Sequence, residues 1–306
     1  MMKHLYIIAA GLFLFAGCMK KLEVNEPVFD VKVEKPTWRA GEEVKFRLAG
    51  NPDLISFYSG EPLHDYAFAA GRIVETAGLD LSFNTSVEFG KQADQLSVMA
   101  SVDFNGGTRF EDITAATWTD ITSRFKLAGS ATYTPSGKAD ITDLKTAGKP
   151  LYLAFRYRVK NPSVYGTGNV WRVQNFLLTA QTSIGAIQLG SMLNGGFRIF
   201  DQMPDIAPSR STISATTLQL IAPALADSTR TVDTECWIVT KGMETGDLDY
   251  GPDRPASVKG YADPAVTETV YVYPRPGKYR AVFTAFNANI AGSKEMVREV
   301  EIEIVP

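Results

Sequence analysis

The sequence has few of the side chains that stabilise small secreted folds or carry out catalysis. Its 306 residues include only two cysteines, Cys18 and Cys236, and two histidines, His4 and His64. Cys18 ends an N-terminal apolar segment, so Cys236 is alone in the body of the chain and cannot form an internal disulfide there. The fold must therefore depend on packing, and Cys236, which precedes Trp237, is expected to be a buried, inert thiol.

The chain also lacks an excess of charge of either sign. It has 31 Lys and Arg against 34 Asp and Glu, a formal net charge of −3 and a pI of about 5.6. No basic stripe is present, which argues against nucleic acid as a partner. No second apolar run after the N-terminal one is long enough to span a bilayer.

Catalytic motifs are absent as well. Only His64 follows the leader, no G-x-S-x-G or G-x-G-x-x-G sequence occurs, and no His or Cys pair has metal-ligand spacing. Carboxylate pairs such as Asp201 with Asp205 would need a set separation across a cleft to act as a glycosidase, and solvated turn acids are the simpler interpretation. The sequence therefore predicts a protein that is not an enzyme.

The first residues of the chain have the pattern of a secretory leader that ends at Cys18. Lys3 precedes an apolar run from Leu5 to Phe15, which is followed by Ala16, Gly17 and Cys18. The small pair before a cysteine resembles a bacterial lipobox, which implies a signal peptide over 1–17 and a lipid on Cys18. That lipid would be the membrane attachment of the mature chain.

A polar segment over residues 18–27 follows, and we expect it to be the lipidated tether. Bacteroidota-type lipoproteins that reach the cell surface often carry acidic residues directly after the cysteine, whereas here Lys20 and Lys21 precede Glu23 and Glu26. We expect an outer-membrane lipoprotein, with the cell surface favoured over the periplasmic face.

Strand patterns dominate the rest of the chain. Apolar and polar residues alternate over 29–33, 44–48, 96–104 and 300–304, and Gly, Pro, Asn and Asp interrupt the chain at short intervals. Such alternation places one set of side chains on a buried face and the other in water. The fold class predicted is all-β, built from sandwiches or barrels.

The two ends of the chain resemble halves of one domain. Trp38–Gly50 and Ile55–Tyr66 resemble the opening strands of a polycystic-kidney-disease (PKD)-type, immunoglobulin-like domain, and Val270–Ala288 with Val297–Val305 resemble its closing strands. The resemblance implies a PKD-like sandwich made of residues 28–73 and 241–306.

The middle of the chain, residues 74–240, resembles a different module. Three stretches, Ala116–Phe125, Ser136–Arg158 and Asn169–Ala180, are similar to jelly-roll modules of the choice-of-anchor and cleaved-adhesin kind, which are related to carbohydrate-binding sandwiches. The layout as a whole resembles a family of Bacteroidota-type lipoproteins with a PKD-like frame. It implies a jelly-roll domain inserted into the immunoglobulin-like sandwich.

Aromatic residues in turns are the candidate ligand contacts. Tyr165 lies in the Pro- and Gly-bounded loop from Asn161 to Asn169, Tyr133 lies in another turn, and Trp118 precedes a strand edge. Exposed rings of this kind can stack on sugars, since aromatic side chains with a polar group suit half-wet sites. Trp171, at the start of a strand, is expected in the core.

Metal binding is not predicted, with structural calcium as the alternative. Jelly rolls of this kind often hold a calcium ion on carboxylates and carbonyls, and Asp103 and Asp120 lie near expected strand ends. No other cofactor is expected.

Two functions are compatible with these features. The first is a lipid-anchored, extracytoplasmic glycan-binding protein that helps outer-membrane uptake proteins capture polysaccharide. The alternative is a structural or adhesive cell-envelope protein that contacts other proteins.

Overall fold

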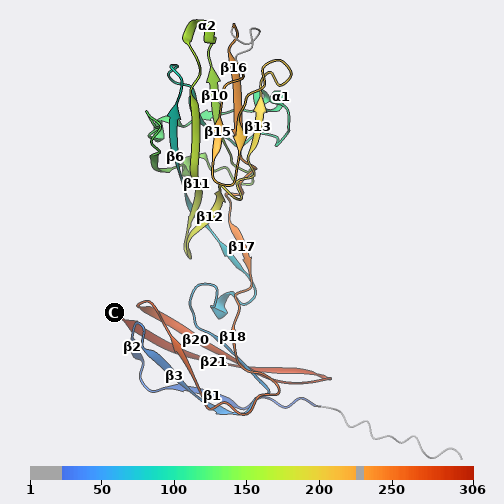
Figure 1. The fold of residues 1–306 in the computed structure, drawn as a ribbon. Coiled ribbons are helices and arrows are strands. Elements are labelled where there is room, and N and C mark those ends of the chain that lie inside the picture. The colour runs from blue at the N-terminus through green and yellow to red at the C-terminus, as the bar shows by residue number, and fades with distance from the viewer. Residues whose placement is uncertain (1–22, 225–230) are drawn as a thin grey trace, which may run out of the picture. The chain divides into compact units, whose positions relative to one another are not determined.

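The computed structural model describes residues 23–224 and 231–306, and they form an all-β protein (Figure 1). The chain divides into two compact units, one made of residues up to 72 together with 250–306 and the other of residues 73–249. No helix among the described residues is long and apolar enough to cross a membrane. Cys18 and the first part of the expected tether lie outside the described residues.

The first unit consists of two sheets built from both ends of the chain. One has the order β1-β3-β19 and the other β18-β4-β20-β21-β2. The strands are β1 (Phe29–Val33), β2 (Thr37–Arg39), β3 (Glu43–Gly50), β4 (Leu54–Tyr58), β18 (Ala256–Lys259), β19 (Glu268–Val272), β20 (Gly277–Asn289) and β21 (Gly292–Val305), with a 3₁₀ turn, η1 (Tyr66–Phe68).

Alternation explains why these strands pack as they do. Val44, Phe46 and Leu48 of β3 are buried, whereas Glu43 and Arg47 are exposed. The buried set meets Phe283 of β20 in one core cluster, where the rings of Phe46 and Phe283 lie 5.1 Å apart. Strands from the two ends of the sequence thus share a core.

A buried ion pair supplements this core. Arg72 donates two hydrogen bonds to the carboxylate of Asp253, at 2.7 and 2.6 Å, and its guanidinium lies 3.6 Å from the centre of the Phe68 ring. The guanidinium lowers the pKa of Asp253 below its ordinary value. Asp253 also accepts from the backbone N–H of Asp65, so its carboxylate ties three segments of the unit together.

The second unit is also made of two sheets. Their orders are β13-β16-β10-β7-β8 and β14-β15-β11-β6-β9, and β12 pairs with β11. The strands are β6 (Thr76–Glu88), β7 (Leu96–Ser101), β8 (Thr119–Asp120), β9 (Thr134–Asp140), β10 (Tyr152–Val159), β11 (Val170–Thr182), β12 (Gly185–Ser191), β13 (Arg198–Asp201), β14 (Thr212–Ile213), β15 (Leu218–Leu220) and β16 (Thr234–Val239). Short helices are α1 (Phe110–Ala115), α2 (Pro162–Tyr165), η2 (Thr122–Arg124) and η3 (Thr142–Leu144).

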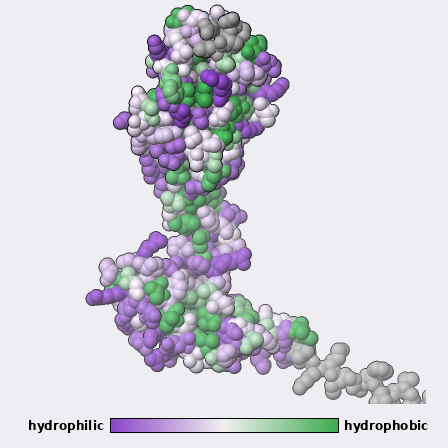
Figure 2. Space-filling view, in the orientation of Figure 1, coloured by the Kyte–Doolittle hydropathy of each residue, from purple (hydrophilic) through white to green (hydrophobic). Residues whose placement is uncertain are grey.

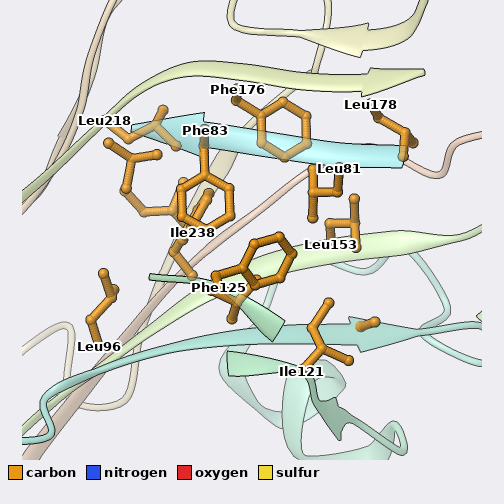
Figure 3. Packing of buried hydrophobic residues seen from close by; sticks show 14 of the residues in the cluster. Leu81, Phe83, Leu96, Ile121, Phe125, Leu153, Phe176, Leu178, Leu218 and Ile238 are labelled. Atoms are coloured by element: carbon orange, nitrogen blue, oxygen red, sulfur yellow. The ribbon is translucent and has the colours of Figure 1, made fainter. Parts of the chain in front are cut away.

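The core of this unit lies between its two sheets. Leu81 and Phe83 of β6 and Phe176 of β11 face Leu153 of β10 and Ile238 of β16 (Figure 3). A second buried cluster lies on the outer face of the five-stranded sheet, where α1 covers Trp237 and Phe200. Trp171 is 7% exposed and belongs to the main core.

The chain leaves the second unit later than the sequence predicts. We expected the return at residue 241, but residues 241–249 belong to the second unit. Met243 is buried in its main core and exchanges two backbone hydrogen bonds with Leu151, of 2.8 and 2.9 Å. The two strands that link the units, β5 (Arg72–Val74) and β17 (Leu248–Gly251), pair as a two-stranded sheet.

Candidate functional site

Two loops lie side by side at one end of the second unit, and we call them the tip loops. Residues 89–95 join β6 to β7, and residues 160–169 join β10 to β11 and contain α2. Lys91 N–H donates to Thr167 O at 3.1 Å, which ties the first loop to the second. A Cβ on Gly90 would lie only 2.3 Å from the backbone nitrogen of Asn169, so this close approach requires glycine.

Local sequence explains the shape of the second loop. The side chain of Asn161 accepts a hydrogen bond from Ser163 N–H at 3.0 Å and caps α2, and Pro162 occupies its first turn. The helix ends at Gly166, whose φ is 79°. Figure 1 shows α2, which contains Val164 and Tyr165, at one end of the unit.

Buried amide side chains hold the tip loops together. Gln95 Oε1 accepts from the backbone N–H of Asn169 at 2.8 Å and from its side chain at 2.7 Å. Gln92 Nε2 donates to Lys160 O at 2.9 Å and to Gly166 O at 2.6 Å, and Gln92 Oε1 accepts from Lys160 N–H. Gln92, Gln95 and Asn169 are each less than 10% exposed. Because these bonds satisfy buried polar groups on both loops, they fix the loops to each other.

This network reaches the core through a tyrosine. Tyr157 is 1% exposed, and its hydroxyl donates to Asn169 O at 2.5 Å. Burial raises the pKa of Tyr157, so its hydroxyl stays a proton donor across the physiological range. The tip loops are thus anchored to the sheet beneath them.

Apolar side chains project from this rigid base. Phe89 is 77% exposed, Val164 is 70% exposed and Tyr165 is 54% exposed. Phe89 has a φ of 69°, which is costly for a bulky residue and is typical of positions held for function. Lys160 Nζ lies 5.3 Å from the centre of the Tyr165 ring.

A charged depression of about 120 Å³ lies beside the same loops. Lys160 belongs to its lining and so connects it with the Tyr165 ring. Arg158 Nε lies 3.6 Å from Glu235 Oε2, and Asp233 accepts from Asn161 N–H at 2.7 Å. The lining comprises Ala93, Asp94, Arg158, Val159, Lys160, Gln202, Asp233, Thr234 and Glu235. Exposed rings can stack on a ligand, and the paired charges next to them can form hydrogen bonds with its hydroxyl groups.

The structure does not bring the three expected aromatic residues together. Tyr165 belongs to the tip. Trp118 precedes β8, which pairs with the last residues of β7, away from the tip. Its Nε1 donates to Ile113 O at 3.0 Å and its ring lies 4.9 Å from that of Trp237, so it packs α1 against the sheet. Tyr133 is half-buried just before β9, whose first residue pairs with Thr85 of β6.

The expected calcium ligands are occupied by other contacts. Asp103 accepts from Ser101 Oγ at 2.8 Å and from Thr117 N–H at 2.9 Å, which lowers its pKa, and Asp120 accepts from Thr122 N–H at 2.9 Å. Within residues 23–224 and 231–306, no group of three or more His, Cys, Asp or Glu could hold a metal ion.

A larger groove of about 370 Å³ runs past Asp103. Its lining carries hydroxyl and aliphatic side chains with Asp143 and Lys149, and no ring faces it: Ala100, Ser101, Val102, Asp103, Thr117, Thr119, Asp143, Leu144, Thr146, Lys149 and Leu151. We therefore regard the tip as the better candidate site.

The remaining cysteine is inert. Cys236 is 3% exposed, and burial raises the pKa of its thiol to about 12. Its thiol would therefore not act as a nucleophile at neutral pH.

Sequence reasoning missed Phe89 and the charged depression. Phe89 follows the alternating pattern of β6 and precedes Gly90, and that Phe-Gly pair at a strand end was the available signal. The depression could not be inferred, because Asp94, Arg158 and Asp233 come from three separate segments.

Comparison with known proteins gave one match. A family model described as a domain of unknown function (DUF5017) matches residues 17–197, which is more than half of the chain. No curated protein and no solved structure matched.

Proposed function

Since the chain belongs to the DUF5017 family, whose description leaves its activity open, we propose from its own site that it is a lipid-anchored extracytoplasmic protein that binds glycans. Its role would be to capture polysaccharide at the outer membrane in support of uptake proteins. The finer resemblances, a PKD-like frame and an inserted jelly-roll module related to carbohydrate-binding sandwiches, are part of this proposal.

One observation carries the glycan assignment: exposed aromatic rings stand on two loops that a buried network of hydrogen bonds holds together. Tyr165 and Phe89 project from the tip, and Gln92, Gln95 and Asn169 lie beneath them. A platform that is ordered before binding loses little entropy when a sugar stacks on it. The paired charges beside Lys160 offer donors and acceptors to hydroxyl groups.

The anchor rests on the sequence alone. The leader over residues 1–17, the small pair before Cys18 and the polar segment after it support lipidation. We expect Cys18→Ala to release the protein from the membrane fraction, whereas the unchanged chain should stay there.

A second candidate function is adhesion to another protein. Val164 favours it, because an aliphatic side chain that is 70% exposed suits an apolar protein surface better than a sugar. The two functions differ in their ligand and share the same surface.

The test is a glycan-array screen of the soluble mature chain, followed by calorimetry on Tyr165→Ala. Loss of the ring should weaken binding by about 1 kcal/mol, or roughly fivefold in Kd, and leave the melting temperature unchanged. Tyr165→Phe should retain most of the affinity. Tyr261→Ala, at a 71%-exposed position of the other unit, is the matched control and should bind like the wild type.

Trp171→Ala separates binding from folding. Its side chain is in the core, so the substitution should lower the free energy of unfolding by about 3–5 kcal/mol, measured by urea denaturation. Unchanged affinity in Tyr165→Ala would remove the tip as the glycan site, and a chain that binds no glycan would favour adhesion.

A further inference from the structure

The long β20–β21 hairpin of the first unit projects beyond its sheet. β4 pairs with β20 only from Val282 to Phe286. Three further pairs of the hairpin continue past the end of β4, from Asn287↔Lys294 to Asn289↔Gly292. The two-residue turn Ile290-Ala291 is thus carried away from the core, as Figure 1 shows for these strands.

The side chain at this turn is unusual. Two-residue hairpin turns favour Asn, Asp or Gly, whereas this turn has Ile290, which is 92% exposed. Residues 288–293 read ANIAGS and carry no charge. Figure 2 shows hydrophobic surface at the end of this unit where the described chain begins. Neither the core nor the turn geometry accounts for isoleucine here.

The start of the described chain is fixed next to the same turn. Asn287 Nδ2 donates to Asn25 O at 3.1 Å, and Lys294 Nζ lies 2.7 Å from Glu26 Oε1. Pro27, which follows, is buried. Cys18 precedes Asn25 by seven residues, and a chain of that length spans at most about 25 Å. A lipid on Cys18 would therefore keep this turn close to the bilayer.

We propose that the hairpin turn at Ile290 is a second membrane contact, which enters the headgroup region of the bilayer that holds the lipid on Cys18. The inference rests on the lipid anchor of the proposed function. One apolar side chain cannot by itself keep a protein on a membrane. Beside a lipid anchor it increases the membrane affinity and determines which face of the unit meets the bilayer surface. An uncharged turn with an exposed isoleucine suits this position, since it loses no charge hydration on insertion.

The experiment places a polarity-sensitive fluorophore at the turn. The full lipidated chain with Ile290→Cys is labelled with nitrobenzoxadiazole and reconstituted into vesicles of phosphatidylethanolamine and phosphatidylglycerol. Cys236 is buried and a lipidated Cys18 has no free thiol, so the new cysteine is the one labelled. The control is Arg275→Cys, an exposed residue just before β20, at the opposite end of the same hairpin.

We expect a blue shift of emission at position 290, with quenching by lipids that carry a shallow spin label, and no change at position 275. Protein that floats with the vesicles while both labels remain in water would overturn the inference and leave the lipid anchor intact. Protein that does not float would overturn both. A blue shift without vesicles that grows with protein concentration would assign the turn to a second copy of the chain and would likewise overturn the inference.

Discussion

Gln95 illustrates how one buried side chain can shape a binding surface that it does not touch. Its amide oxygen accepts from the backbone N–H and from the side-chain amide of Asn169, and its amide nitrogen donates to Gln92 Oε1 and Arg158 O, each at 3.2 Å. A glutamine with 2% exposure thus joins the two tip loops to each other and to β10. The exposed rings depend on it because they have little packing of their own.

Replacing Gln95 should therefore loosen the tip. Gln95→Ala leaves the backbone N–H of Asn169 buried without a partner, while the side-chain amide keeps its bond to Gln92 O, so the free energy of unfolding should fall by about 1–3 kcal/mol in urea denaturation. Glycan affinity should fall as well, because the platform loses its order. Gln188→Ala, at an exposed position of β12, should change stability by less than about 0.5 kcal/mol. Equal denaturation midpoints for Gln95→Ala and the wild type would contradict the role given to the network.

Individual strands were the part of the structure that could best be predicted from the sequence. Alternation over 29–33, 44–48 and 300–304 predicted strands that appear as β1, β3 and part of β21, because one face of each meets a core and the other meets water. The predicted all-β class is confirmed on the same grounds.

Contacts between elements far apart in the chain could not be predicted from the sequence. Trp118 was expected as an exposed ring, but its partner Trp237 comes from β16, more than a hundred residues later. Local sequence could not indicate that α1 and its flanking loop cover the outer face of the sheet. The Tyr165 loop was easier, since Asn161, Pro162 and Gly166 mark a capped turn within a few residues.

The close approach of the tip loops makes Gly90 a sensitive position. In Gly90→Ala the new Cβ would meet the backbone of residue 169 and force the two loops apart, which should cost about 1–3 kcal/mol of stability and reduce glycan affinity. Gly129→Ala is the matched control in the same unit, because a Cβ there meets nothing within 4 Å. Melting temperatures and calorimetry measure the stability and the glycan affinity of both variants. A Gly90→Ala protein that equals Gly129→Ala in melting temperature and in glycan affinity would contradict the account.

The chain as a whole holds two units, each with its own core. The first is built from both ends of the sequence and carries the hairpin at Ile290, and the second contains the tip. We propose that the first unit contacts the membrane and that the second unit binds the ligand.

The second unit should fold without the first. Residues 73–249 include an entire core cluster, and their ends belong to the paired strands β5 and β17, so excision leaves no long gap to close. The excised unit should give a cooperative urea transition. A non-cooperative transition, or a fragment that aggregates when first expressed, would show that it depends on the remainder of the chain.

Hydrogen exchange of the full chain tests the central claim most directly, measured by mass spectrometry with and without the glycan that binds best in the array screen. The account predicts that glycan slows exchange in residues 89–95 and 160–169, and leaves the groove at Asp103 and Lys149 unchanged. Protection confined to that groove or to the other unit, with the tip loops unaffected, would contradict it.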